Sequence, residues 1–200
     1  MLPPQYFGSI AYYVTMSQYG RVKIVNTLRH DKRFKSVHRC DIADVNGPLQ
    51  LTVPLSKESP ASEGMPRRWC DMRVSSHAGW WSDHIVSLES AYGRTPFFEF
   101  YFDRFRPWIS DNHLPITELN AALDREVRRI LSLDCEVEYV DGDTAVSSAA
   151  LTMPPYPARI VEYYQVRRDR LGFIPSLSIL DLIFNLGPEA PLILKAMQPQ

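Results

Sequence analysis

Residues 1–25, MLPPQYFGSIAYYVTMSQYGRVKIV, contain the clearest indication of the architecture. The two prolines near the start favour a short extended segment, because proline has no backbone N–H for a helix. Gly8-Ser9 then marks the beginning of a helix through IAYYVTMSQY, whose apolar residues recur at helical spacing. RVKIV, residues 21–25, alternates in polarity and is rich in β-branched residues, which is typical of a strand. A short strand, a helix and a second strand in so few residues predict an α/β fold.

The next part of the chain predicts more strands. Asn46-Gly47 separates two alternating runs, 39–45 and 48–55, and this dipeptide is a strong hairpin signal. WCDMRVS, residues 69–75, is predicted to be a further short strand. The polar segments around these strands, 26–38 and 56–68, are predicted to be loops.

The second half is predicted to be mostly helical. Residues 78–92 form an expected helix that ends at Gly93, and Thr95-Pro96 is an expected N-cap and first turn for residues 97–105. The remaining predicted elements are an amphipathic helix over 114–134, a strand at 135–140, a loop at 141–159 and a last helix. The last helix is predicted to begin at Ser176 or Ser178, with Asp181 in a capping box, and to stop at Gly187-Pro188. We therefore expect one α/β domain over residues 1–200, with a mixed sheet flanked by helices and a mostly helical second half.

Composition and charge exclude several classes of protein. The chain of 200 residues is 45% hydrophobic, which is sufficient for a core. Its net charge of −1 provides no overall field that would attract nucleic acid, so we expect no nucleic-acid partner. No apolar run approaches the roughly 18 residues that span a bilayer, and no export signal is visible at the start. We expect a cytoplasmic protein without a membrane span.

Three cysteines occur, widely spaced and without a CxxC pair, so a zinc knuckle is not expected. Reduced, structural thiols are the expected state, with a low-pKa nucleophile at Cys40, after His38-Arg39, as the alternative. No P-loop, dinucleotide, esterase or zinc-peptidase motif is present, and the sequence identifies no cofactor.

The segment 77–105 is the first candidate site, because it places many aromatic rings beside titratable groups. Its helix brings His84 and Glu89 near Trp80, Trp81 and Tyr92, which suggests an aromatic-walled pocket for a polar ligand. His84 is a candidate general base; the alternative is a buried histidine with a structural hydrogen bond. No metal site is expected, because His77 and His84 are seven residues apart rather than four. Arg94 lies where one helix ends and the next begins, so it either helps to bind an anion or neutralises the preceding carbonyls.

Residues 31–39, DKRFKSVHR, are the second candidate site. Lys35 and Arg39 are suited to hold a phosphate or carboxylate, and His38 is a second candidate base. A solvated loop whose charges maintain solubility is the alternative interpretation.

Four segments resemble the WbqC-like protein family, in the short version found in Bacteroidetes-type bacteria: PQYFGSIAYY, FKSVHRCDIADVNGPLQLTVPLSK, SLESAYGRTPFFEFY and LSILDLIFNLGPEA. They occur in the family's order along nearly the whole chain. The opening departs from the longer Gln-Pro-x-x-x-Pro form, and residues 135–158 are short and divergent. The resemblance implies a role among O-antigen and surface-polysaccharide functions, with nucleotide-sugar or amino-sugar modification in the cytoplasm. It provides no catalytic residues, so the site residues above are chosen from the sequence alone.

The leading hypothesis is a transferase that adds an acyl or aminoacyl group to an amino-sugar nucleotide. Lys35 and Arg39 would hold phosphates, His84 or His38 would deprotonate the amine with Glu89 nearby, and Trp80, Trp81 and Tyr92 would stack on the sugar or base. The alternatives are a non-catalytic accessory protein of polysaccharide assembly and a nucleotidyl-transfer enzyme. If His84 is the base, His84→Ala should abolish turnover with little change in melting temperature.

Overall fold

The computed structural model describes residues 1–56, 67–141 and 159–199, so most of the predicted loops at 56–68 and 141–159 lie outside the described residues. The strands are β1 Arg21–Val25, β2 Arg39–Asp44, β3 Gly47–Thr52 and β4 Glu136–Val140. The α-helices are α1 Ile10–Ser17, α2 Trp80–Tyr92, α3 Phe98–Phe105, α4 Ile116–Ile130, α5 Arg168–Leu171, α6 Ile179–Leu186 and α7 Ala190–Ala196. Short 3₁₀ turns are η1 Lys32–Val37, η2 Trp69–Asp71, η3 His77–Gly79, η4 Arg106–Trp108 and η5 Gly187–Glu189.

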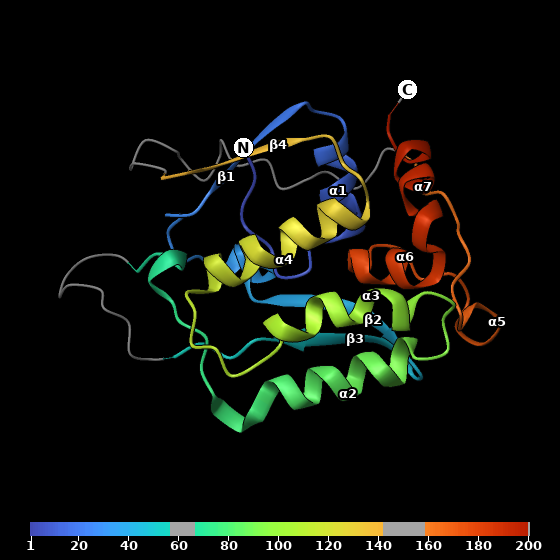
Figure 1. Cartoon of the computed structure of the whole chain (residues 1–200), viewed down its shortest axis with the longest axis horizontal. Helices are drawn as coiled ribbons and strands as arrows, with labels where there is room; N and C mark the ends of the chain where they lie inside the picture. The colour runs from blue at the N-terminus through green and yellow to red at the C-terminus, as the bar shows by residue number, and fades with distance from the viewer. Residues whose placement is uncertain (57–66, 142–158, 200) are drawn as a thin grey trace.

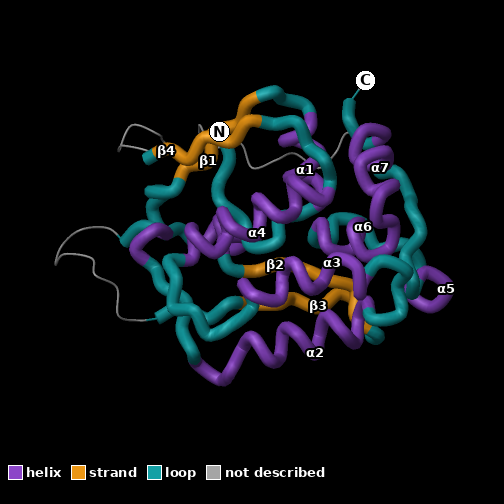
Figure 2. Tube along the Cα trace, viewed as in Figure 1, coloured by secondary structure: helices purple, strands orange, loops and turns teal. Residues whose placement is uncertain are grey.

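The strands form one parallel and one antiparallel pair, which confirms the α/β class with mixed strand directions. β1 pairs with β4 in parallel, and β2 pairs with β3 in antiparallel register, so that the described strands make two separate two-stranded sheets. The predicted first strand is reduced to a parallel bridge between Leu2 and Ile24. Helices pack on the β2–β3 hairpin, because α2 and α6 contact β2, and α3 packs on α4 and α6 (Figures 1 and 2). Tyr139 of β4 hydrogen bonds to Asp124 of α4.

The hairpin is confirmed, with its turn one residue earlier than the sequence suggested. Asp44 pairs with Gly47, so the two linking residues are Val45 and Asn46. Gly47 is already the first residue of β3, and its φ of +123° is a value that only glycine adopts without strain. The glycine therefore permits the sharp entry into β3 rather than forming the turn itself.

Two local predictions are wrong. Residues 69–71 form the turn η2, because the Asp71 carboxylate and the Arg68 backbone and guanidinium hydrogen bond to each other and hold a tight turn. Of the predicted strand 69–75, Arg73 and Val74 make only isolated bridges. Thr95 is not the N-cap of α3: its hydroxyl donates to the Tyr92 carbonyl and completes the end of α2 instead.

Helix α6 follows the predicted boundaries, with one difference in the capping, whereas α7 lies beyond the predicted stop at Gly187-Pro188 and was not predicted. Ser178 is the N-cap of α6, and its hydroxyl accepts the Leu180 N–H. The Asp181 carboxylate does not complete a capping box, because it is buried and accepts hydrogen bonds from Tyr163 at 2.6 Å and Gln165 at 2.9 Å. Gly187 ends α6 with a φ of +51°.

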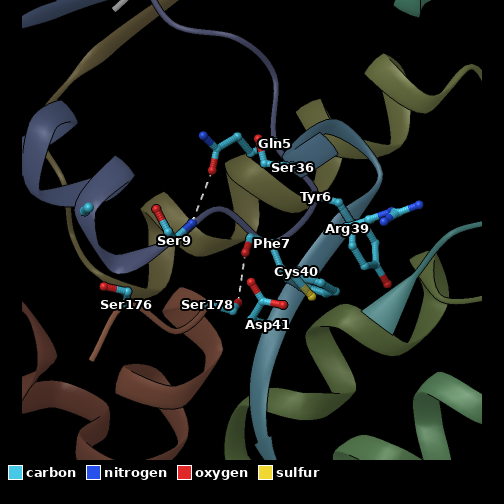
Figure 3. Close-up of a pocket in the computed structure, with 11 residues that line it drawn as sticks. Gln5, Tyr6, Phe7, Ser9, Ser36, Arg39, Cys40, Asp41, Ser176 and Ser178 are labelled. Carbon is cyan, nitrogen blue, oxygen red and sulfur yellow. Dashed lines mark hydrogen bonds between the residues drawn. The ribbon is translucent and has the colours of Figure 1, made fainter. Parts of the chain in front are cut away.

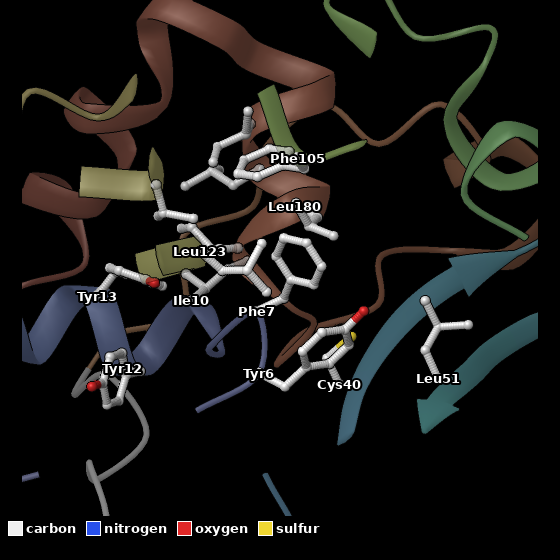
Figure 4. Packing of buried hydrophobic residues seen from close by; sticks show 14 of the residues in the cluster. Tyr6, Phe7, Ile10, Tyr12, Tyr13, Cys40, Leu51, Phe105, Leu123 and Leu180 are labelled. Carbon is white, nitrogen blue, oxygen red and sulfur yellow. The ribbon is translucent and has the colours of Figure 1, made fainter. Parts of the chain in front are cut away.

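The core joins the first residues of the chain to the last helices. Tyr6 and Phe7 are buried completely, and Phe7 packs edge-on against Phe105 at 5.3 Å (Figure 4). α6 is buried along nearly its whole length and contacts α1, α2 and α3. In the described part of the chain, no helix has the length and apolar character needed to cross a bilayer.

Candidate functional site

A cavity of about 400 Å³ lies where the N-terminal loop, residues 3–9, the start of β2 and the residues before α6 meet (Figure 3). Tyr6, Phe7, Ala11 and Cys40 form part of its wall. Its polar lining consists of Gln5, Ser9, Ser36, Arg39, Asp41, Ser176 and Ser178. Polar side chains from three distant parts of the sequence therefore converge on one space.

Backbone hydrogen bonds bring these three segments together. Ile10 N–H donates to the Leu177 carbonyl at 3.0 Å, and Ile179 N–H donates to the Gly8 carbonyl at 2.9 Å. Ser178 N–H donates to the Asp41 carbonyl at 2.8 Å, which attaches β2 to the same junction. The Tyr6 N–H donates to the Ser36 carbonyl at 2.9 Å. The walls of the cavity are thus fixed by main-chain contacts rather than by mobile side chains.

Two wall residues have an unfavourable backbone conformation. Phe7 has a φ of +41° and Ser176 a φ of +64°, in a region that side-chain-bearing residues rarely occupy. The Ser178 hydroxyl donates to the Phe7 carbonyl at 2.8 Å and helps to hold this conformation. Such residues cost about 1–3 kcal/mol each and cluster at ligand sites. Their position on one cavity supports a functional reading of it.

Two residues of the cavity lining have buried polar atoms without a protein partner in the described part of the chain. The Ser36 hydroxyl oxygen and the Arg39 Nε are buried and have no hydrogen-bond partner among the described residues. Gln5 is also buried, and its Oε1 accepts the Ser9 N–H at 3.2 Å. Buried polar atoms are nearly always paired in folded proteins, so unpaired ones in residues that line a cavity are candidates to bind a ligand.

Arg39 and Asp41 lie on the same side of β2 and are joined through Gln50. The Arg39 guanidinium donates to Gln50 Oε1, and Gln50 Nε2 donates to Asp41 Oδ1, both at 3.1 Å. Asp41 lies close to Phe7 and Ser178, whereas the Arg39 guanidinium projects away from them (Figure 3). The cavity therefore has a carboxylate at its wall and a cation at its edge.

Cys40 does not have the properties of a nucleophile. Its side chain is buried, and burial raises the pKa of the thiol far above its usual value, with a smaller contribution from Asp41. A thiolate is therefore strongly disfavoured, and the alternative of a low-pKa cysteine is wrong. All three cysteines are unpaired.

His84 is buried between the N-terminal loop and the end of β3. Its Nε2 lies 3.2 Å from the Thr52 carbonyl, and its Nδ1 lies 2.9 Å from the Tyr6 hydroxyl. Because a carbonyl only accepts, Nε2 carries the hydrogen and Nδ1 accepts the hydrogen bond from Tyr6. Burial lowers the pKa of His84 to about 4. Both ring nitrogens are thus occupied, and Nδ1 holds the hydroxyl of Tyr6, which is part of the cavity wall.

The predicted aromatic residues Trp80, Trp81 and Tyr92 do not line the cavity. Trp80 is buried and packs edge-on against His84 at 4.9 Å, and Trp81 packs against Trp80. The Tyr92 hydroxyl accepts the Ala43 N–H at 3.1 Å in the core. Glu89 and Arg94 are exposed. The buried residues Trp80, His84 and Tyr92 pack α2 onto the hairpin.

The predicted basic loop is divided between the cavity and the surface. Arg39 lines the cavity, whereas Lys35 is exposed one residue before the lining Ser36. His38 is half-buried, with Nδ1 3.2 Å from the Val53 carbonyl, and burial lowers its pKa. Its ring lies 5.6 Å from that of Trp69, outside the cavity lining. Of the predicted site residues, only Arg39 is among the described residues that line the cavity.

Ser36 belongs to the predicted basic segment 31–39, whereas sequence reasoning missed five polar lining residues: Gln5, Ser9, Asp41, Ser176 and Ser178. Four of the five lie within the segments that resemble the family, which is the one signal that points to them; Ser176 precedes the last of those segments. Their residue types are common in turns and caps, so composition and spacing gave no indication of a site. Among the described residues, no three His, Cys, Asp or Glu side chains are grouped as metal ligands would be.

Comparison with known proteins identifies a family and no individual relative. No curated protein and no solved structure matches the chain. The family match covers residues 3–151, which include the N-terminal loop, η1 and β2 that form most of the cavity wall. The chain belongs to the WbqC-like protein family.

Proposed function

We propose that this cavity binds the sugar of an amino-sugar nucleotide, and that the protein transfers an acyl or aminoacyl group to the sugar amine in the cytoplasm, in the synthesis of a surface polysaccharide. The observation that carries the proposal is the buried, unpaired Ser36 hydroxyl in a polar cavity that also contains the Asp41 carboxylate.

The lining suits a small molecule with many hydroxyl or amine groups. Serine hydroxyls both donate and accept hydrogen bonds, Gln5 offers an amide, and the Asp41 carboxylate accepts from hydroxyl or ammonium groups. The cavity of about 400 Å³ lies within the ~300–1,000 Å³ typical of small-molecule sites. A sugar ring uses such a set of groups better than an apolar ligand would.

The cations at the edge suit the phosphates of the nucleotide. Arg39 borders the cavity with its guanidinium directed outward, and the exposed Lys35 is close to it in sequence. Arginine binds phosphate oxygens through several donors at once, and lysine supplies a further positive charge. The sugar would then lie inside and the diphosphate at the edge.

The transfer requires an activated acyl donor, a thioester or an ester, as co-substrate. The sugar amine attacks the donor carbonyl carbon, the C–N amide bond forms, and the bond from that carbon to sulfur or oxygen breaks. The amine loses a proton, and the leaving thiolate or alkoxide gains one. Asp41 is the lining carboxylate that accepts the amine proton. His84 acts through Tyr6 as a positioning residue, and His38 and Glu89 receive no part in the proton transfer.

Isothermal titration calorimetry tests the proposal with UDP-glucosamine, ATP and acetyl-coenzyme A as separate ligands. We expect UDP-glucosamine to bind, and Asp41→Asn to weaken binding and abolish acetyl transfer. Asp103→Asn, at an exposed aspartate of α3, is the matched control and should behave as the wild type. Absence of UDP-glucosamine binding, or equal effects of the two substitutions, would overturn the proposal.

A non-catalytic accessory protein is the second candidate, and one observation favours it. Among the described lining residues there is no histidine, and the single thiol is too deeply buried to ionise. If the protein binds UDP-glucosamine and returns it unchanged in the presence of every acyl donor, the binding role is the correct one. Binding of ATP alone would instead indicate nucleotidyl transfer.

A further inference from the structure

We propose that a small apolar crevice beside the polar cavity receives the acyl group and limits it to about two carbon atoms; this inference rests on the proposed function. The crevice has Ala11 and Ser176 in common with the cavity, so that the two spaces adjoin. Its other walls include Ile10, Tyr163, Phe173 and Met197.

The layout matches a ligand with three parts. In Figure 3, Ser176 and Arg39 lie on opposite sides of the cavity. A nucleotide sugar whose phosphates contact Arg39 therefore directs the far side of its sugar toward Ser176 and the crevice beyond. The amide substituent is the apolar part of an acylated amino sugar, and the crevice offers the apolar surface next to it.

The size of the crevice sets the chain length. Its volume is about 20 Å³, and a cavity needs roughly 10–15 Å³ to contain one water-sized group. An acetyl methyl group fits in this space, whereas the two further methylene groups of a butanoyl chain do not.

The walls of the crevice are held in place. The Tyr163 hydroxyl donates to the buried Asp181 carboxylate at 2.6 Å, and its ring packs edge-on against Phe173 at 5.3 Å. Because the hydroxyl is occupied by Asp181, Tyr163 presents its ring rather than a polar group to the crevice. Met197 is buried at the end of α7 and is the wall residue whose removal would enlarge the space.

Calorimetry with UDP-N-acetylglucosamine and UDP-N-butanoylglucosamine tests the inference, because both ligands have the same nucleotide, sugar and amide. We expect the acetyl compound to bind the wild type about tenfold more tightly, since the longer chain would clash with the crevice walls and its acyl group would lose the burial that the acetyl methyl group gains. Met197→Ala should remove most of this preference by admitting the longer chain. Ala11→Val should fill the junction and weaken binding of the acetyl compound severalfold.

Matched controls separate these effects from altered folding. Met197→Leu keeps the side-chain volume and should keep the preference for the acetyl ligand. Ala196→Val, at an exposed position of α7, is the same substitution as Ala11→Val but lies outside the crevice. If the wild type binds both ligands equally, the crevice does not select the acyl group, although the sugar still binds. The same conclusion holds if the preference for the acetyl ligand is unchanged in both Met197→Ala and Ala11→Val. Failure of both ligands to bind would instead overturn the proposed function.

Discussion

Ser36 carries a hydroxyl that the fold leaves unpaired, so its removal should affect a ligand more than the protein. We predict that Ser36→Ala leaves the free energy of unfolding unchanged or slightly higher, because no protein hydrogen bond is lost. Binding of UDP-glucosamine should weaken about fivefold, which corresponds to one hydrogen bond of about 1 kcal/mol. Urea unfolding and calorimetry measure the two quantities.

Ser82→Ala in α2, at an exposed serine outside the cavity lining, is the control and should change neither quantity. If Ser36→Ala lowers stability by more than about 1 kcal/mol, the hydroxyl has a structural partner and is not free to bind a ligand.

His84 should make the protein sensitive to mild acid. Its pKa is about 4 in the fold against 6.5 when unfolded, so between these values the unfolded chain binds a proton that the folded chain does not. Stability contributed by the neutral ring is therefore present above pH 6.5 and is lost as the pH falls toward 4. The loss amounts to about 3 kcal/mol by linkage, and urea unfolding at pH 7 and 4.5 measures it.

His84→Gln removes the titrating ring, and we expect it to flatten this pH dependence relative to the wild type. The comparison also cancels the buried carboxylates Asp124 and Asp181, whose pKa values are raised by burial and which act in the opposite direction. Parallel curves for the two proteins would contradict the lowered pKa of His84.

The buried position of His84 also changes the expectation for His84→Ala, which should lower the melting temperature rather than leave it unchanged.

At the scale of elements, Gly8 sets how closely the N-terminal loop approaches α1. A Cβ at this position would lie 2.9 Å from Tyr12 Cδ1 and 3.3 Å from Gln5 Oε1. We predict that Gly8→Ala lowers stability by about 1–3 kcal/mol through overpacking and weakens UDP-glucosamine binding by displacing Gln5. Gly20→Ala is the control, because a Cβ there has no neighbour within 4 Å. Equal melting temperatures for the two variants would show that the loop yields without cost.

Gly187, at the end of α6, packs closely against Phe97, the residue before α3. Its φ of +51° disfavours any side chain, and a Cβ would lie 2.5 Å from the Phe97 ring. Gly172 has a φ of +71° with no neighbour within 4 Å, so Gly172→Ala measures backbone strain alone. We predict that Gly187→Ala lowers the melting temperature clearly more than Gly172→Ala does. Similar losses would mean that Phe97 moves aside easily.

Most elements could be predicted because their signals are local. Ser9 and Ser178 cap α1 and α6 with their own hydroxyls, and the hairpin follows from the alternating pattern around Asn46 and Gly47. The N-cap predicted at Thr95 failed because its hydroxyl turns back to the Tyr92 carbonyl, an equally local option that sequence does not distinguish. The strand expected at 69–75 failed because Arg68 and Asp71 pair in a tight turn.

For the whole molecule, we predict a single cooperative unfolding transition. The family match ends at residue 151, yet α6 packs against α1, α2, α3 and β2, and the Gln198 amide donates to Ser17. Tryptophan fluorescence reports on Trp69, Trp80, Trp81 and Trp108, and a dye at an introduced cysteine in place of the exposed Ala196 reports on α7. Coincident midpoints in urea are expected for one unit, whereas two separated transitions would divide the chain into domains.

The site could not be predicted at this scale because it depends on contacts far apart in sequence. Ser36 and Ser178 carry no pattern that relates them, and they line the same cavity only because main-chain bonds join the N-terminal loop to both η1 and the residues before α6. The aromatic cluster around Trp80 was conspicuous in sequence, but its rings pack α2 onto the hairpin. Rings pack cores as readily as they line pockets, so their abundance alone does not distinguish the two.

The hydrogen bonds from Ile10 to Leu177 and from Ile179 to Gly8 have a consequence for how the protein is made. The N-terminal loop leaves the ribosome long before residue 177 has been synthesised. This wall of the cavity therefore cannot form until residues 177–179 are available to pair with the loop. Fragments truncated before residue 177 would retain many hydrophobic segments but would lack one wall of the cavity.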